Sequence, residues 1–126
     1  MAISYVTAAS LDGTQNGSAP IYGARAWVNF NGTGTVAIRA SGNVTSITDN
    51  GTGYYTVNFT TAMADANYSA IASSTRTTNN TAASTDMYCQ NVIVGLATGS
   101  YIIKTGYPSG INTTEDSPDV RTAVFR

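Results

Sequence analysis

Apolar and polar residues alternate along much of this chain with the two-residue period of a β-strand. Between residues 24 and 30 every even-numbered residue is apolar, from Ala24 to Phe30, whereas Arg25 and Asn29 stand at odd-numbered positions. Because successive side chains of a strand point to opposite faces, this run predicts a strand with one face in a core.

Further runs of this kind are separated by short turns rich in Gly and Asn, for example at residues 31–34 and 49–51. The runs predict strands at residues 35–40, 53–60, 67–73, 86–95, 101–104 and 120–125, with a further short strand at residues 2–8. No interval has the periodicity of a helix. About seven to eight short strands predict an all-β fold, an antiparallel β-sandwich in a jelly-roll or immunoglobulin-like arrangement.

The first part of the chain has a different character from the rest. Residues 11–20 read LDGTQNGSAP, a polar segment that contains two glycines and finishes at Pro20. We expect residues 1–20 to form an extended N-terminal arm or linker that docks on another protein by adding a strand or filling a groove. Residues 21–126 have the length of one domain, and we expect them to form the sandwich.

The register of the first predicted hairpin decides what Trp27 contacts, since a slip of one residue exchanges the two faces of a strand. If Trp27 lies across from Arg39, the guanidinium can stack on the indole. If it lies across from Ile38, the indole belongs to an apolar layer. The sequence leaves the register open, and it favours packing over a ligand platform as the role of Trp27.

Few residues of this chain are charged, and this bears on which classes of partner it can bind. Charged residues make up 10% of the sequence, the formal net charge is −1, and Lys104 is the only lysine. No basic stripe exists that would neutralise a run of phosphates, so we expect no nucleic-acid partner. Low charge also gives little repulsion between copies, and we expect a homo-oligomer or a subunit of a larger assembly.

The residue types that most often carry chemistry are nearly absent. The chain has no histidine, and Cys89 is its only cysteine, which excludes an intrachain disulfide and predicts an inert buried thiol. We therefore expect no catalytic residues, no metal and no cofactor. No apolar run reaches the length of a transmembrane helix, so we expect no membrane insertion.

Several consecutive sequence words carry a resemblance to a known family. They are ARAWVNFNGT at residues 24–33, VAIRASGNVTSITD at 36–49, GYYTVNF at 53–59 and AVF at 123–125. Together they closely resemble a module of bacteriophage tail fibres and other phage virion proteins, common in marine phages and in prophages. Arg126 departs from the family pattern, which has glycine there. The likeness is strong over residues 23–70, weak over 74–119 and returns at 120–125.

The resemblance implies a virion structural protein, often trimeric and often near the distal end of a fibre, and it supplies no catalytic residues. We expect specificity to lie in the poorly matched loops at residues 74–85 and 106–119, since loops on a rigid sandwich commonly carry recognition. A host surface glycan is a candidate ligand, with aromatic rings for stacking and polar groups for hydrogen bonds. The candidate binding residues are Asn79, Asn80, Tyr101, Tyr107, Asn112 and Asp116.

Three residues of the well-matched part are candidates for scaffold or oligomer contacts. Arg25 and Arg39 are expected to donate hydrogen bonds between sheets or between subunits, and Trp27 is expected to pack with them.

Two other functions compete with a receptor-binding fibre module on the virion. A capsid decoration protein, docked through residues 1–20, is favoured by the short segment before the sandwich, which leaves no room for a fibre shaft. A glycan depolymerase needs two carboxylates about 5 to 9.5 Å apart. Glu115, Asp116 and Asp119 are the only acidic cluster, and we read them as a solvated turn.

Overall fold

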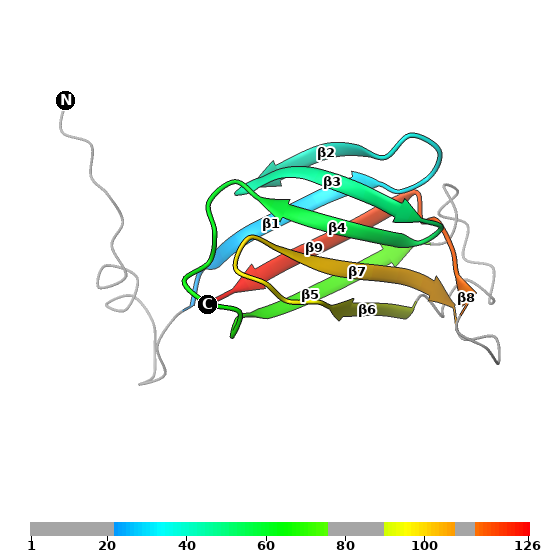
Figure 1. The fold of residues 1–126 in the computed structure, drawn as a ribbon. Helices are drawn as coiled ribbons and strands as arrows, with labels where there is room; N and C mark the ends of the chain where they lie inside the picture. The colour runs from blue at the N-terminus through cyan, green and yellow to red at the C-terminus, as the bar shows by residue number, and fades with distance from the viewer. Residues whose placement is uncertain (1–21, 76–89, 108–112) are drawn as a thin grey trace, which may run out of the picture.

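The computed structural model describes residues 22–75, 90–107 and 113–126, which form two antiparallel β-sheets packed face to face (Figure 1). The strands are β1 (Ala24–Asn31), β2 (Ala37–Gly42), β3 (Val44–Gly51), β4 (Tyr54–Phe59), β5 (Ser69–Thr75), β6 (Gln90–Val94), β7 (Ser100–Tyr107), β8 (Thr113–Thr114) and β9 (Asp119–Phe125). The described part contains no helix. The predicted all-β sandwich is confirmed.

Each sheet has a pair of central strands that come from distant parts of the chain. Sheet A has the order β2-β1-β9-β5, and sheet B has the order β3-β4-β7-β6 with the two-residue strand β8 added to β7. The chain passes from one sheet to the other between β2 and β3, between β4 and β5, between β5 and β6, and again between β8 and β9. The first and the last strand of the described residues, β1 and β9, therefore lie side by side (Figure 1).

The core lies between the sheets and follows the alternation of the sequence. From Ala26 onward in β1, and throughout β4, every second residue is buried, and Phe30, Tyr55 and Val57 have no exposed surface. Edge-to-face contact between Phe30 and Tyr55, with ring centroids 5.2 Å apart, joins the two sheets. Tyr101 and Ile103 of β7 and Val120 and Val124 of β9 belong to the same buried layer.

Strand β3 was not expected from the sequence, which predicted a turn at residues 49–51. Those residues instead form the last part of β3, and the turn follows at Thr52 and Gly53. β3 is an edge strand, and of its eight residues only Val44 is buried. A strand that faces solvent on one side and has an open edge needs few apolar residues, so its polar sequence resembled a turn.

The first hairpin adopts neither of the two registers that the sequence left open. Trp27 lies across from Gly42, Asn29 lies across from Ala40, and a bulge at Arg39 shifts the pairing so that Phe30 meets Ile38. The bulge inserts an extra residue into β2, which a simple count along a hairpin does not include. Trp27 therefore stacks on neither Arg39 nor Ile38.

Two strands extend further than expected and shorten the predicted loops. β5 continues to Thr75 and β7 continues to Tyr107, whereas β9 begins at Asp119. The predicted arm at residues 1–20, its short strand at residues 2–8, and Cys89 lie outside the described residues.

Candidate functional site

The strand ends that border residues 76–89 and 108–112 meet at one end of the sandwich, which we call the loop end. β5 finishes there at Thr75, β6 begins at Gln90, and β7 finishes at Tyr107 beside β8 (Figure 1). Thr75 lies across from Asp119, and Gln90 lies across from Gly106. Residues 76–89 and 108–112 are thus attached to the sandwich at the same end, as expected if both belong to one recognition surface.

A small pocket opens at the loop end between the two sheets. Its walls are Ser74 and Thr75 of β5, Thr105 and Gly106 of β7, and residues 115–117, which connect β8 to β9. The lining offers hydroxyl groups, backbone groups and carboxylates, and no aromatic ring. Such a lining can hydrogen-bond a polar group of a ligand but has little apolar surface to hold one.

The connection formed by residues 115–117 is held by bonds to both sheets. The backbone N–H of Glu115 donates to the carbonyl of Thr105 at 3.0 Å, and the hydroxyl of Thr105 donates to the carbonyl of Glu115 at 2.7 Å. The N–H of Gly32 donates to the carbonyl of Ser117 at 2.8 Å. The Ser117 side chain, which is buried, donates to the carbonyl of Thr75. Residues 115–117 are therefore held in place at the loop end by hydrogen bonds to the sandwich.

Asp116 and Tyr55 form the centre of this fixed region. Oδ1 of Asp116 accepts a hydrogen bond from the N–H of Gly53 at 2.7 Å. The Tyr55 hydroxyl lies 2.8 Å from the same oxygen and 2.9 Å from the carbonyl oxygen of Gly32, so its one proton can be donated to either. Burial, and then the hydrogen bond and charge of Asp116, raise the pKa of the Tyr55 phenol. Tyr55 is therefore a hydrogen-bond donor here rather than a nucleophile or base.

Two glycines allow the backbone to come this close. A Cβ on Gly32 would lie 2.5 Å from the Tyr55 hydroxyl oxygen, and a Cβ on Gly53 would lie 2.5 Å from the carbonyl oxygen of Thr105. Gly53 also has a φ of +62°, in the left-handed region that favours glycine.

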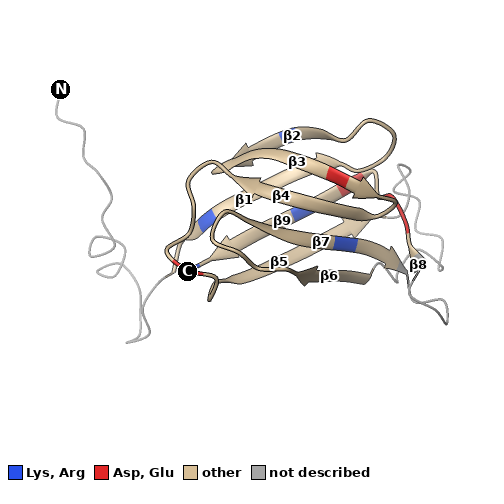
Figure 2. Cartoon of the chain, in the orientation of Figure 1, with Lys and Arg blue, Asp and Glu red and all other residues tan. Residues whose placement is uncertain are grey.

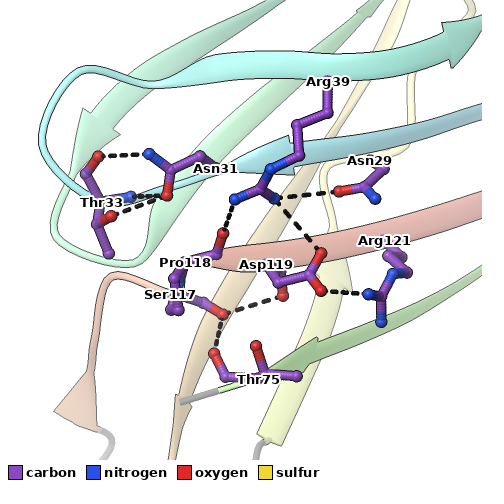
Figure 3. A network of polar contacts seen from close by, with 9 residues as sticks. All are labelled: Asn29, Asn31, Thr33, Arg39, Thr75, Ser117, Pro118, Asp119 and Arg121. Carbon is purple, nitrogen blue, oxygen red and sulfur yellow. Dashed lines mark hydrogen bonds and ion pairs between the residues drawn. The ribbon is translucent and has the colours of Figure 1, made fainter. Parts of the chain in front are cut away.

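Charged side chains from β2 and β9 form a network beside the loop end, on the outer face of sheet A (Figure 3). Arg39 donates to the carbonyl of Pro118 at 2.6 Å and to Oδ1 of Asn29 at 3.3 Å, and it lies 3.5 Å from Asp119. Asp119 also pairs with Arg121. Exposed ion pairs contribute little stability each, on the order of 0 to 1 kcal/mol, so this network orders side chains more than it stabilises the fold.

The structure contradicts the predicted role of Tyr101 and gives Asp116 contacts that the sequence did not predict. Tyr101 is 1% exposed, and its hydroxyl lies 2.5 Å from that of Thr122 in the core. The prediction that its ring stacks on a ligand is therefore wrong, because Tyr101 lies on the inward face of β7 together with Ile103 and Thr105. Asp116 lies at the loop end as expected, but its Oδ1 holds Gly53 and Tyr55 instead of pointing freely to solvent.

The other predicted binding residues are not brought into the site by the described part of the chain. The backbone of Tyr107 belongs to β7 and pairs with Thr113, at the rim of the loop end. Asn79, Asn80 and Asn112 lie outside the described residues.

The three scaffold candidates all belong to sheet A, and their contacts are within that sheet. Arg25 donates to the carbonyl of Arg126 at 3.2 Å, linking β1 to the residue after β9. Arg39 links β2 to β9, as described above. The described side-chain bonds of both arginines run to β1, to β9 and to the residues that flank β9, and none of them reaches a strand of sheet B. The expected contacts between subunits stay a prediction. Trp27 is 44% exposed on the outer face.

Sequence reasoning missed Tyr55 and Ser117 as site residues. Tyr55 was recognised only as an alternating core residue of β4, and its partner Asp116 is 61 positions away. Ser117 precedes a proline in a polar run, and nothing in that run distinguishes a buried hydroxyl from an exposed one. The one available signal was the Asp116-Ser117-Pro118 sequence, whose Asp and Ser are residues that often bond to nearby backbone in turns.

Among the residues that the structure describes, no group of three or more Cys, Asp or Glu side chains is placed to hold a metal ion. Within the same ranges, no helix is long and apolar enough to cross a membrane. Comparison with protein-family models, with curated proteins and with solved structures found no match to this chain.

Proposed function

We propose that this chain is a non-enzymatic bacteriophage virion protein, exposed on the particle surface as a receptor-binding module of the tail-fibre kind. The sequence words at residues 24–59 support the virion origin, and the geometry of the sandwich supports the binding role. The single observation that carries the binding role is the separation of two ends. Both poorly matched segments attach at the loop end, whereas the chain enters β1 at Ala24, beside Phe125, at the opposite end.

A protein with this layout can be fastened at one end and can present variable segments at the other. The fixed connection at residues 115–117 gives those segments a defined starting point, which lowers the entropy lost when they bind a ligand. The described chain enters β1 at the opposite end, and we propose that residues 1–20 dock on another virion protein. This is the arrangement that a tip module needs.

We propose a homotrimer as the assembled form, from the resemblance and the low charge of the chain. Light scattering of the isolated protein checks this, and the expected mass is three times that of the chain. A monomer at high protein concentration would contradict trimerisation in isolation and would restrict assembly to the particle.

Copy number on the particle separates a fibre module from capsid decoration. Quantitative mass spectrometry of purified particles is expected to find about a dozen to a few dozen copies, a multiple of three if the trimer holds. Hundreds of copies would contradict the fibre module and would indicate a decoration protein docked through residues 1–20. Absence of the chain from the particle would contradict the virion origin.

The proposal also excludes a depolymerase, because the acidic cluster is occupied within the fold. Asp116 bonds to Gly53 and Tyr55, and Asp119 pairs with Arg121. The purified protein is expected to release no reducing ends from bacterial surface polysaccharide. Release that is lost in Glu115→Gln, with the folded state unchanged by circular dichroism, would overturn this part of the proposal.

A further inference from the structure

The outer face of sheet A carries an exposed apolar row away from the loop end. Trp27 of β1 and Ile71 of β5 both lie across from Ala123 of β9, so the three side chains cross the sheet in one line. Trp27 is 44% exposed and Ile71 is 60% exposed. Because Ala123 is small, the sheet surface is low between two larger apolar side chains.

The indole of Trp27 is held in place by the strand beside it. A Cβ on Gly42 of β2 would lie 2.9 Å from Cδ1 of Trp27, so the indole occupies the space that a side chain at this position would fill. The ring is thereby backed by the sheet while a large part of it remains open to solvent. An aromatic ring that is fixed before binding loses little entropy when a ligand stacks on it.

A polar row runs beside the apolar one. Asn29 of β1 lies across from Arg121 of β9, and Arg121 lies across from Ser73 of β5 (Figure 3 shows Asn29 and Arg121). Trp27 and Arg121 are diagonal neighbours in this ladder, about 7 to 8 Å apart and within reach of long side chains. Arg121 has a side chain that is 57% exposed, and Asp119 is its ion-pair partner among the described residues. A guanidinium has five N–H donors, so donors remain for a ligand.

The described residues of sheet A differ in charge from the other described residues, and Figure 2 shows where the charged positions lie along the strands. Among the described residues, sheet A and its rim carry four arginines, namely Arg25, Arg39, Arg121 and Arg126, against Asp65 and Asp119, which is a side-chain charge of +2. The other described residues carry Lys104 against three acids, namely Asp49, Glu115 and Asp116, which is −2. A second copy placed symmetrically on this face would bring like charges together. An anionic ligand is therefore favoured over self-association here.

We propose that the outer face of sheet A is a binding site for a hexuronic acid unit of an acidic polysaccharide. A pyranose ring has a face of C–H groups that stacks on an indole, and the equatorial carboxylate of a hexuronate projects from the edge of that ring. With the ring on Trp27, the carboxylate reaches the guanidinium of Arg121, which binds carboxylates through paired N–H groups. Asn29 and Ser73 are placed for the sugar hydroxyls. The site is distinct from the loop end.

A titration of the full chain with tri-galacturonate, followed by ¹H–¹⁵N NMR, tests the site. Trp27 is the only tryptophan, so its indole N–H gives a single, assigned signal. We expect the largest shifts at Trp27, Ala123 and Arg121. Galactotriose lacks only the carboxylates and is expected to bind about tenfold more weakly, as loss of one charge-assisted interaction predicts.

Two variants and one matched control assign the binding to these residues. Trp27→Ala and Arg121→Gln are each expected to weaken tri-galacturonate binding about tenfold. The control is Lys104→Gln, because Lys104 also lies beside an aromatic ring, 5.0 Å from the centre of Tyr54, but on sheet B. It removes the same charge and is expected to leave the affinity unchanged.

Three results would overturn the proposal. Equal losses in Arg121→Gln and Lys104→Gln, or equal shifts with polyglutamate, would mean that net charge alone attracts the anion. Shifts centred on residues 113–117 would assign sugar binding to the loop end instead. An oligomer that dissociates to monomers in Trp27→Ala, measured by light scattering, would make this face an interface between copies.

Discussion

The two ends of the sandwich are each closed by a buried tyrosine, but the two hydroxyls meet different partners. At the loop end, the hydroxyl of Tyr55 lies 2.8 Å from a carboxylate oxygen of Asp116. At the opposite end, the hydroxyl of Tyr68 lies 3.0 Å from the carbonyl of Ala97 and 2.9 Å from that of Ser100. A bond to a charged group is stronger than one to a neutral carbonyl, so one side chain carries more of the stability at the loop end.

The surroundings of the two tyrosines reinforce this difference. At the loop end, Tyr55, Gly32 and Gly53 all contact the single connection at residues 115–117. At the opposite end, the Asn43 amide binds the carbonyls of Arg25 and Thr61 independently of Tyr68. A substitution at the loop end is therefore expected to disturb several elements, whereas a substitution at the opposite end is expected to disturb only its own contacts.

The largest effect is expected for Gly53→Ala, with Gly34→Ala as its control. Both glycines have a φ of +62°, so both substitutions carry the same left-handed strain of about 1 kcal/mol. Only Gly53 is also surrounded by backbone atoms of Thr105 and Glu115. We expect Gly53→Ala to lose about 3 kcal/mol in the free energy of unfolding, measured in urea. Equal losses at both positions would show that the loop end is not tightly packed.

A smaller effect is expected when each tyrosine loses its hydroxyl. Tyr55→Phe leaves Asp116 with one donor fewer and should cost about 2 kcal/mol of unfolding free energy, whereas Tyr68→Phe should cost about 1 kcal/mol. Urea unfolding of both variants measures the difference. A larger loss in Tyr68→Phe would reverse the comparison between the ends.

Alkaline pH provides a third test, since burial raises the pKa of Tyr55, Tyr68 and Tyr101 above the ordinary 10.0, for Tyr101 to about 12. A phenol that holds its proton more tightly in the folded state stabilises the fold fully below pH 10. This contribution is lost as the pH rises from 10 towards 12. We expect unfolding free energy to fall over that range, and to fall less steeply in Tyr55→Phe than in Tyr68→Phe. Equal slopes in the two variants would remove the special role of Asp116.

The smallest effect is expected for the exposed ion pair at the opposite end, in which Nη2 of Arg126 lies 2.5 Å from Oδ2 of Asp65. The hydrogen bond from Arg126, and then the backbone N–H of Asn67, lower the pKa of Asp65 below its ordinary 3.8. Its contribution is therefore present above pH 3.8 and is lost as the pH falls through the lowered value. We expect Asp65→Asn to shift the urea midpoint only at low salt. A shift that persists at high salt would indicate a larger role for this end.

The fold could be predicted from the sequence where one face of a strand is buried. β1 and β4 were predicted because their alternation of apolar and polar residues shows which side chains enter the core. β3 was missed because this edge strand has almost no buried residues. Tyr101 was mistaken for a surface aromatic because its neighbours Ile102 and Ile103 give no alternation that shows which face is inward.

The sequence predicted where the candidate site lies but not which contacts form it. The sequence pointed to the loops at residues 74–85 and 106–119 as candidate recognition segments, and the structure brings their described parts to one end. The contacts that fix this end join residues far apart in the chain, such as Tyr55 with Asp116 and Thr75 with Ser117. Pairings of this kind follow from how the sheets are stacked, and no local pattern encodes them.

We propose that the chain is fastened to a virion at one end and presents the loop end to the outside. Hydroxyl-radical footprinting of intact particles, compared with the isolated protein, tests it most directly. We predict that Tyr22, which is 67% exposed in the sandwich, becomes protected on the particle, while Thr114 of β8 stays as accessible as in isolation. Protection of Thr114 with Tyr22 left accessible would contradict the account.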